Sequence, residues 1–130
     1  MDKKQRILII GQYGYYSLIA EGYLRFYAGK KLKIKTTAFD NFKVSNKVAK
    51  ILEEDIIQSK ENIQPLEKMR LETFDHLLLV GTPASSFSEG KFKGDLHIIK
   101  IKKNLSLKEE RDLIKKKVLK FLGQQGMYLD

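Results

Sequence analysis

The chain has 130 residues, of which 42% are hydrophobic and 32% are charged, and this balance predicts one globular domain over residues 1–130. It contains no cysteine, so disulfides, thiolate metal sites and cysteine nucleophiles are excluded. The formal net charge of +9 is spread evenly, since residues 1–65 hold 12 Lys and Arg against 7 Asp and Glu, and residues 66–130 hold 13 against 9.

The first part of the sequence alternates between strand and helix patterns. Residues 6–11 (RILIIG) form a continuous apolar run, which is typical of a strand covered on both faces. Residues 17–31 carry apolar side chains near the helical period, and Gly29 offers a stop. Residues 32–38 alternate between apolar or Thr side chains and lysine, which predicts a half-buried strand.

Two helices and a strand are predicted in the middle of the chain. Residues 45–56 predict a short helix with Ser45 as its N-cap. Pro65 suits the first position of a helix over residues 65–74. The apolar run of residues 75–81 then predicts a second buried strand.

The last two elements are a lysine-rich strand over residues 96–102 and the clearest helix, over residues 106–123. Ser106 and Glu109 have the spacing of a capping box at the start of this helix. Its C-terminal half carries four lysines, which predict a solvated face: Lys115, Lys116, Lys117 and Lys120.

This order of elements predicts an α/β fold of three layers, with a four-stranded parallel sheet in the order 2-1-3-4 and helices on both faces. The two apolar strands belong in the middle, and the two lysine-bearing strands belong at the edges, where lysine discourages aggregation. A ligand crevice is expected at the C-terminal ends of strands one and three, where the strand order reverses. The loop Gly11–Ser17 lies there, and so does the long loop Thr82–Asp95.

The stretch from Arg6 to Ala38 resembles the start of the low-molecular-weight protein tyrosine phosphatases and of their relatives, the thioredoxin-coupled arsenate reductases. In that family a strand ends in a nucleophilic cysteine, followed by an arginine, a Ser or Thr, and a helix carrying Ala-Glu-Gly or similar. Ser17 and Ala20-Glu21-Gly22 match the last two features. Looser similarity extends over nearly the whole chain, including VSNKVAKILEEDI and FDHLLLVGTPA. The resemblance implies the fold of these enzymes and a phosphate-binding loop.

The departures from the family pattern fall on its reacting groups. Counted back from Ser17, the arginine position is Tyr16 and the cysteine position is Ile10. Counted forward from the strand, the cysteine position is Gly11, so the loop is one residue short. In either count the thiolate nucleophile and the guanidinium that binds the phosphoryl oxygens are missing.

The family's general acid is an aspartate in the loop after the fourth strand, where this sequence has Lys102-Lys103-Asn104. Asp95 lies before that strand, at the wrong end. Without a general acid the leaving group stays unprotonated, and arsenate reduction requires redox cysteines. We therefore expect no activity by the family mechanism.

The candidate ligand loop consists of Gly11, Gln12, Tyr13, Gly14, Tyr15, Tyr16 and Ser17. Three interpretations of it are open. The preferred one is that the three tyrosines fill the emptied pocket as an aromatic plug. They also suit an aromatic contact surface, since tyrosine is enriched at interfaces. Finally, a helix N-terminus binds an anion weakly through its backbone N–H groups alone.

Lys91 and Lys93 form a second candidate site, because the loop Thr82–Asp95 lies beside the crevice. They are suited to an acidic partner or a phosphate, although a solvated loop tip is the simpler interpretation. The two histidines, His76 and His97, lie inside predicted strands, where core positions are expected rather than metal ligands. No metal and no cofactor are expected.

The sequence therefore predicts a catalytically inactive homologue of these enzymes that binds a protein or a phosphorylated ligand. The chain has no apolar run near the ~18 residues of a membrane span and no visible signal peptide, so a cytoplasmic protein without membrane contact is expected. One alternative is a divergent hydrolase using Ser17 or a tyrosine. The last alternative is a basic nucleic-acid-binding domain, which the evenly spread charge and the lack of a known motif disfavour.

Overall fold

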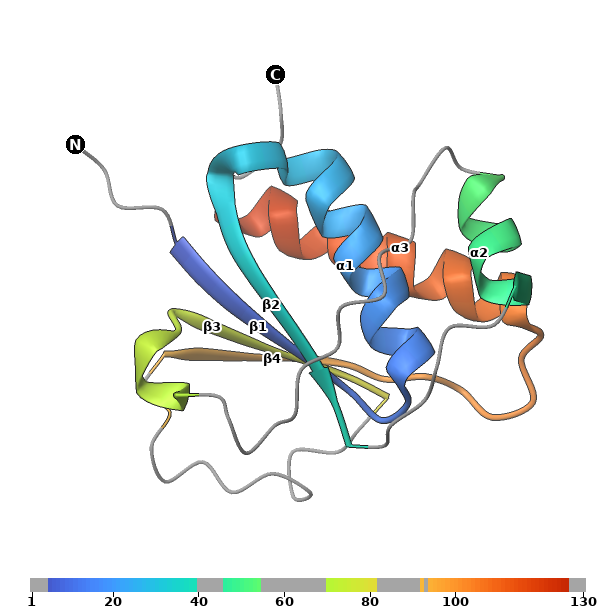
Figure 1. The fold of residues 1–130 in the computed structure, drawn as a ribbon, viewed down its shortest axis with the longest axis horizontal. Coiled ribbons are helices and arrows are strands. Elements are labelled where there is room, and N and C mark those ends of the chain that lie inside the picture. The colour runs from blue at the N-terminus through green and yellow to red at the C-terminus, as the bar shows by residue number, and fades with distance from the viewer. Residues whose placement is uncertain (1–4, 40–45, 55–69, 82–91, 93, 127–130) are drawn as a thin grey trace.

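The computed structural model of the chain describes residues 5–39, 46–54, 70–81, 92 and 94–126. Within them, four strands form one parallel sheet in the order β2-β1-β3-β4 (Figure 1). The strands are β1 (Gln5–Gly11), β2 (Leu32–Ala38), β3 (His76–Val80) and β4 (Asp95–Ile99). The predicted order is confirmed, with the two apolar strands in the middle. Of the two edge strands only β2 carries lysines, because β4 ends at Ile99, before Lys100 and Lys102.

The register of the sheet explains the sequence patterns of its strands. Ile9 of β1 lies opposite Thr36 of β2 on one side and Leu78 of β3 on the other. Because β1 and β3 have neighbours on both sides and are buried on both faces, their side chains are apolar without alternation. The β2 edge strand buries alternate side chains and exposes Lys33 and Lys35, as the alternating pattern predicts.

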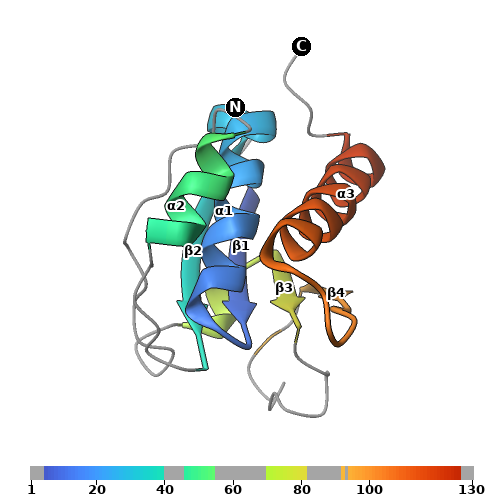
Figure 2. The same cartoon turned by 90° about the vertical axis from the view of Figure 1, so that its right-hand side faces the viewer.

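In the described residues three α-helices lie together on one side of the sheet (Figure 2). They are α1 (Gly14–Ala28), α2 (Asn46–Glu53) and α3 (Leu107–Gln125), of which α1 packs against the strands and α2 packs against α1 and α3. Their apolar side chains form one cluster with the sheet, in which Ile19 and Tyr23 of α1 and Val118 of α3 are fully buried. A 3-10 turn over Gly29–Lys31 ends α1, so the predicted stop at Gly29 is confirmed.

The opposite face of the sheet carries a second apolar cluster. Its buried members are Leu8, Ile10, Phe74, Leu77 and Leu79. Most of the helix that the sequence predicts over residues 65–74 lies outside the described residues. At its described end the prediction is wrong, because Arg70 and Phe74 have extended backbones and only a 3-10 turn over Leu71–Thr73 lies between them. Helices on this second face therefore stay a prediction, and so does the N-cap at Ser45, which also lies outside the described residues.

Strand β4 is shorter than predicted, ending at Ile99 instead of residue 102. The reason lies in its neighbour. Strand β3 ends at Val80, and Gly81 turns away with φ +76 after donating its N–H to the Ile99 carbonyl at 2.8 Å. Beyond that bond β4 has no partner strand in the described residues, so the strand stops there.

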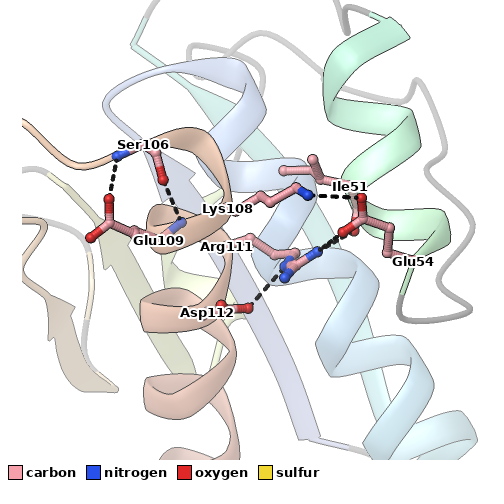
Figure 3. Close-up of polar contacts among 7 residues, drawn as sticks. All are labelled: Ile51, Glu54, Ser106, Lys108, Glu109, Arg111 and Asp112. Carbon is pink, nitrogen blue, oxygen red and sulfur yellow. Dashed lines mark hydrogen bonds and ion pairs between the residues drawn. The ribbon is translucent and has the colours of Figure 1, made fainter.

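The capping box at the start of α3 is confirmed. The Ser106 hydroxyl accepts the Glu109 N–H at 3.2 Å, and the Glu109 carboxylate accepts the Ser106 N–H at 3.0 Å (Figure 3). Together these two bonds satisfy donors that helix geometry leaves unpaired. None of the helices in the described part of the chain combines the length and apolar character needed to cross a membrane.

Candidate functional site

The predicted ligand loop is mostly the first turn of a helix. Strand β1 ends at Gly11 and α1 begins at Gly14, three residues before the predicted start at Ser17, so only Gln12 and Tyr13 connect them. The Tyr13 carbonyl accepts the N–H groups of Tyr16 at 3.1 Å and of Ser17 at 3.4 Å, which starts the helix early. The early start was missed because three tyrosines and a glycine are weak helix formers and no capping side chain marks the helix start.

Ser17 closes this connection from the inside. Its hydroxyl is fully buried and donates to the Thr37 carbonyl of β2 at 2.7 Å. A Cβ atom added to Gly11 would lie 2.3 Å from the Ser17 Oγ and 2.7 Å from the Tyr13 carbonyl oxygen. A side chain at Gly11 therefore has no room in this arrangement.

The two positions that the family pattern assigns to its nucleophile are both closed. At Gly11, the position counted forward, Ser17 and Tyr13 occupy the space that a side chain would need. Ile10, the position counted back, is fully buried in the apolar cluster on the opposite face of the sheet. A reactive side chain at either position would not point into an open site.

The three tyrosines of the loop, Tyr13, Tyr15 and Tyr16, form one aromatic cluster. The rings of Tyr13 and Tyr15 are stacked with centroids 5.8 Å apart, and those of Tyr15 and Tyr16 are tilted at 4.6 Å. Tyr16 is 5% exposed, whereas Tyr13 is 38% exposed. The cluster thus reaches from the core to the surface.

Tyr16 lies over the C-terminal end of β3. A Cβ atom added to Gly81 would lie 2.6 Å from the Tyr16 ring, so the ring rests on the bare backbone of this glycine. At Gly81 φ is +76, a conformation that a side chain rarely adopts. Tyr16 thus lies at the carboxyl end of β3, and the interpretation of the tyrosines as a plug of an emptied pocket stays a prediction.

Glu110 of α3 holds the cluster from the other side. The Tyr16 hydroxyl donates to its carboxylate, and the Tyr15 hydroxyl lies 3.3 Å from the same group. Burial, followed by the hydrogen bond to Glu110, raises the pKa of Tyr16 above its ordinary value, and burial also raises that of Tyr15. Both phenols therefore stay protonated at neutral pH.

Sequence reasoning did not identify Glu110. The only signal was its place next to Glu109 in the first turn of α3, where an acidic residue is ordinary because it suits the helix dipole. Glu110 contacts Tyr16 of α1, which is 94 residues away in the sequence. A contact between residues so far apart produces no local sequence pattern that could predict it.

Lys91 and Lys93, the second candidate site, lie outside the described residues, as does most of the loop Thr82–Asp95. Their prediction stays untested. In the described ranges no group of three or more His, Asp or Glu side chains is arranged to hold a metal ion.

The two histidines lie in the sheet as predicted, but they also touch each other. His76 of β3 is 3% exposed, and its Nδ1 lies 3.3 Å from the Nε2 of His97 of β4, while its Nε2 contacts the side-chain oxygen of Gln5. Burial lowers the pKa of both rings, and the proximity of His76 lowers that of His97 further. Neutral imidazoles fit this arrangement, since one ring nitrogen donates and the other accepts.

Beside His76 a cavity of about 510 Å³ opens at the amino ends of β1, β3 and β4. This is the end of the sheet remote from the aromatic cluster, which follows the carboxyl end of β1. The cavity is lined by Gln5, Glu72, Phe74, Asp75, His76, Gly94, Asp95 and Gln125.

No protein-family model matches the sequence, and no curated protein matches it significantly. Solved structures do match. An arsenate reductase in its oxidized state has a TM-score of 0.80 at 14% identity, with 92% of this chain and 98% of that chain covered. The arsenate reductase of Archaeoglobus fulgidus has a TM-score of 0.66 at 20% identity, covering 90% and 98%.

A mutant of YwlE from Bacillus subtilis has a TM-score of 0.70 at 18% identity, and the match covers 94% of this chain and 99% of that one. At such low identities these likenesses show the fold. The chain therefore has the fold that its sequence predicts: a four-stranded parallel sheet in the order 2-1-3-4 with helices, shared with arsenate reductases.

Proposed function

We propose that this chain is a catalytically inactive protein on the arsenate reductase fold, which acts as a binding or regulatory module through its aromatic cluster. The observation that carries the proposal is the closure at Gly11, where an added Cβ atom would lie 2.3 Å from the Ser17 Oγ. The place where the family pattern puts its nucleophile is filled by the loop itself.

The residue types support the same conclusion. The chain contains no cysteine, and Tyr16 stands where the family pattern has its arginine. A phosphoryl or arsenate oxyanion is bound in such loops by a guanidinium and by backbone N–H groups. Here the N–H groups of Tyr16 and Ser17 both donate to the Tyr13 carbonyl.

A protein partner fits the cluster better than a phosphorylated ligand. The Glu110 carboxylate lies against Tyr15 and Tyr16 beside the N-terminus of α1, and a negative charge there opposes the approach of an anion. Tyr13 is 38% exposed and stacked on Tyr15, so it offers a rigid aromatic surface at low entropic cost.

The alternative of a divergent hydrolase finds little support. The Ser17 hydroxyl is fully buried and donates to Thr37, and a serine nucleophile requires an adjacent base. A tyrosine nucleophile requires a phenolate, whereas the pKa of both Tyr15 and Tyr16 is raised.

An amide NMR titration tests the proposal, with phosphate, arsenate and a phosphotyrosine peptide as ligands and chloride as the ionic-strength control. We expect no saturable shifts at Gly11–Ser17. We also expect only background hydrolysis of p-nitrophenyl phosphate and only background reduction of arsenate, with the Archaeoglobus fulgidus arsenate reductase as the positive control for the second assay. Saturable oxyanion shifts in this segment, or turnover lost on Ser17→Ala, would refute the inactive-module proposal.

The contact surface has its own test. A photo-crosslinking amino acid replaces Tyr13 in one variant and Phe26 in the control, since Phe26 is an aromatic residue of comparable exposure (47%) near the far end of α1. We expect a discrete crosslinked protein in extracts of the source organism from position 13 and not from position 26. Equal crosslinking from both positions would mean that the aromatic cluster is no special surface.

A further inference from the structure

The outer edge of β4 (Asp95–Ile99) carries backbone groups that pair with no described strand. Among the described strands β4 is the last of the sheet, and its only partner there is β3. The Asp95 N–H donates to the Asp75 carbonyl at 2.9 Å, and the Ile99 carbonyl accepts the Gly81 N–H at 2.8 Å, so these residues point their backbone groups inward. Because a strand has a period of two, Leu96 and Ile98 point theirs outward.

A groove of about 210 Å³ runs between this edge and α3. Its apolar floor consists of buried side chains from three elements: Leu78, Ile99 and Phe121. His97 also faces α3, since its ring lies 4.6 Å from that of Phe121. Ile98 also borders the groove and is 40% exposed.

Cationic side chains line the groove from the helix. Lys117 and Lys120 of α3 contribute to its wall, and the exposed Lys100 and Lys102 follow β4 directly. Asp95, the one acidic residue of β4, lies at the opposite end of the strand. Lysines that only guard an edge against aggregation lie on the strand itself, whereas Lys117 and Lys120 face it across the groove.

We propose that the β4 edge binds an extended acidic segment of a partner protein as an additional strand. Its backbone pairs with the outward N–H and C=O groups of Leu96 and Ile98, one apolar side chain enters the groove, and acidic side chains on either side meet Lys117 and Lys120. This surface lies at the β4 edge of the sheet, opposite the β2 edge, and it shares no residue with the aromatic cluster.

The probe is the synthetic peptide acetyl-Thr-Glu-Thr-Val-Thr-Glu-Thr-amide. In an extended strand its two glutamates and its valine share one face at about 6.6 Å spacing. Titrated into the ¹⁵N-labelled full chain, it should produce saturable amide shifts at Leu96, Ile98 and along the Lys117–Lys120 turn. The same peptide with lysine in place of glutamate is the control and should produce none.

Two pairs of variants test the geometry. Ile98→Pro removes the outward N–H, which an edge strand tolerates, and should abolish binding, whereas Ile98→Thr keeps that N–H and should bind. Lys117→Glu with Lys120→Glu should weaken binding about tenfold, because two favourable ion pairs become repulsive. Lys30→Glu with Lys31→Glu changes the net charge equally at two exposed residues after α1 and should leave the affinity unchanged.

Several results would overturn the proposal. No shifts at millimolar peptide, equal shifts with the lysine peptide, or unimpaired binding by Ile98→Pro in a chain that keeps its melting temperature would each do so. Dimerisation of the chain alone, lost in Ile98→Pro by sedimentation, would identify the occupant as a second copy. Shifts of the same residues by an oligonucleotide but not by the peptide would assign the lysines to nucleic acid.

Discussion

Single residues close the loop between β1 and α1 from two sides. Ser17 fills the space above Gly11 and donates to Thr37, and Tyr16 rests on Gly81 and donates to Glu110. Both side chains belong to the predicted ligand loop, Gly11–Ser17. The loop is therefore held by its own side chains, and its stability should depend on them.

Gly11→Cys returns a thiol to the position counted forward from the strand. We expect no p-nitrophenyl phosphate hydrolysis and a loss of about 1–3 kcal/mol in the free energy of unfolding, because the new side chain overlaps Ser17 and Tyr13. Urea unfolding measures the loss. Gln12→Cys places a thiol on the neighbouring exposed residue and should be nearly neutral. A Gly11→Cys variant as stable as the unmodified chain would contradict the closed loop.

Tyr16→Phe removes the hydroxyl that reaches Glu110 and keeps the ring over Gly81. The expected loss is about 1–3 kcal/mol at neutral pH, since a hydrogen bond to a charged group is lost. Because the folded pKa of Tyr16 is raised, its contribution is present below the unfolded value of about 10 and is lost as the pH rises above it. The difference in the free energy of unfolding between wild type and Tyr16→Phe should therefore narrow in urea titrations at alkaline pH. The control Tyr13→Phe should change neither the free energy of unfolding at neutral pH nor its dependence on alkaline pH.

At the scale of elements, α3 joins the parts of the helical layer. Its first turn carries the capping box and Glu110, and its next residue is Arg111. The Arg111 guanidinium donates to the Ile51 carbonyl of α2 at 2.9 Å and to the Glu54 carboxylate just after α2 at 2.8 Å (Figure 3). The same contact with Arg111 lowers the pKa of Glu54. The side chain of Arg111 is only 11% exposed, whereas that of Glu54 is 48% exposed, so the Arg111 end of this ion pair is the end that is shielded from solvent.

Arg111→Ala should destabilise the chain by about 1–3 kcal/mol, because the carbonyl at Ile51 loses its donor in a partly buried place. Lys108→Ala is the matched control. Lys108 contacts the same Glu54 at 3.4 Å but is 63% exposed, so its removal should cost about 0–1 kcal/mol. Thermal unfolding of the two variants measures the difference, and equal losses would mean that Arg111 contributes no more than a surface charge.

At the scale of the whole molecule, the sheet brings the two histidines together near its β4 edge. His76 and His97 belong to neighbouring strands, and both rings pack against Phe121 of α3. Burial lowers the pKa of both, opposed for both by the negative charge of Asp95 and for His76 also by Asp75. The global stability of the chain should therefore depend on pH in the range where histidine titrates.

The lowered pKa values decide whether the free energy of unfolding rises or falls with pH. The unfolded histidines take up protons below about pH 6.5, while the folded pair binds them less readily, so the free energy of unfolding should fall as the pH drops through this range. Urea unfolding at about pH 7.5 and about pH 5.5 measures the effect. In His97→Gln one titrating ring is gone and the fall should be smaller; an unchanged or larger fall would exclude the histidine pair as its source.

Much of the architecture could be predicted because it depends on local patterns. The apolar runs placed β1 and β3 in the middle of the sheet, lysine alternation placed β2 at an edge, and the Ser106 to Glu109 spacing predicted the start of α3. The start of α1 was predicted three residues late, since no capping side chain marks it. The end of β4 was predicted too late, at residue 102 instead of Ile99. An edge strand stops where its neighbour stops, and the end of β3 at Val80 cannot be seen in the sequence of β4.

The sequence by itself determined that the cysteine mechanism is impossible and that the chain forms a parallel α/β sheet, because composition and periodicity are properties of the chain alone. Only the tertiary structure decided how the loop is closed. Glu110 meets Tyr16 across 94 residues, and Ser17 meets Thr37 across 20. Such contacts depend on the crossing of α1, α3 and β2, and no spacing along the sequence encodes the distance between them.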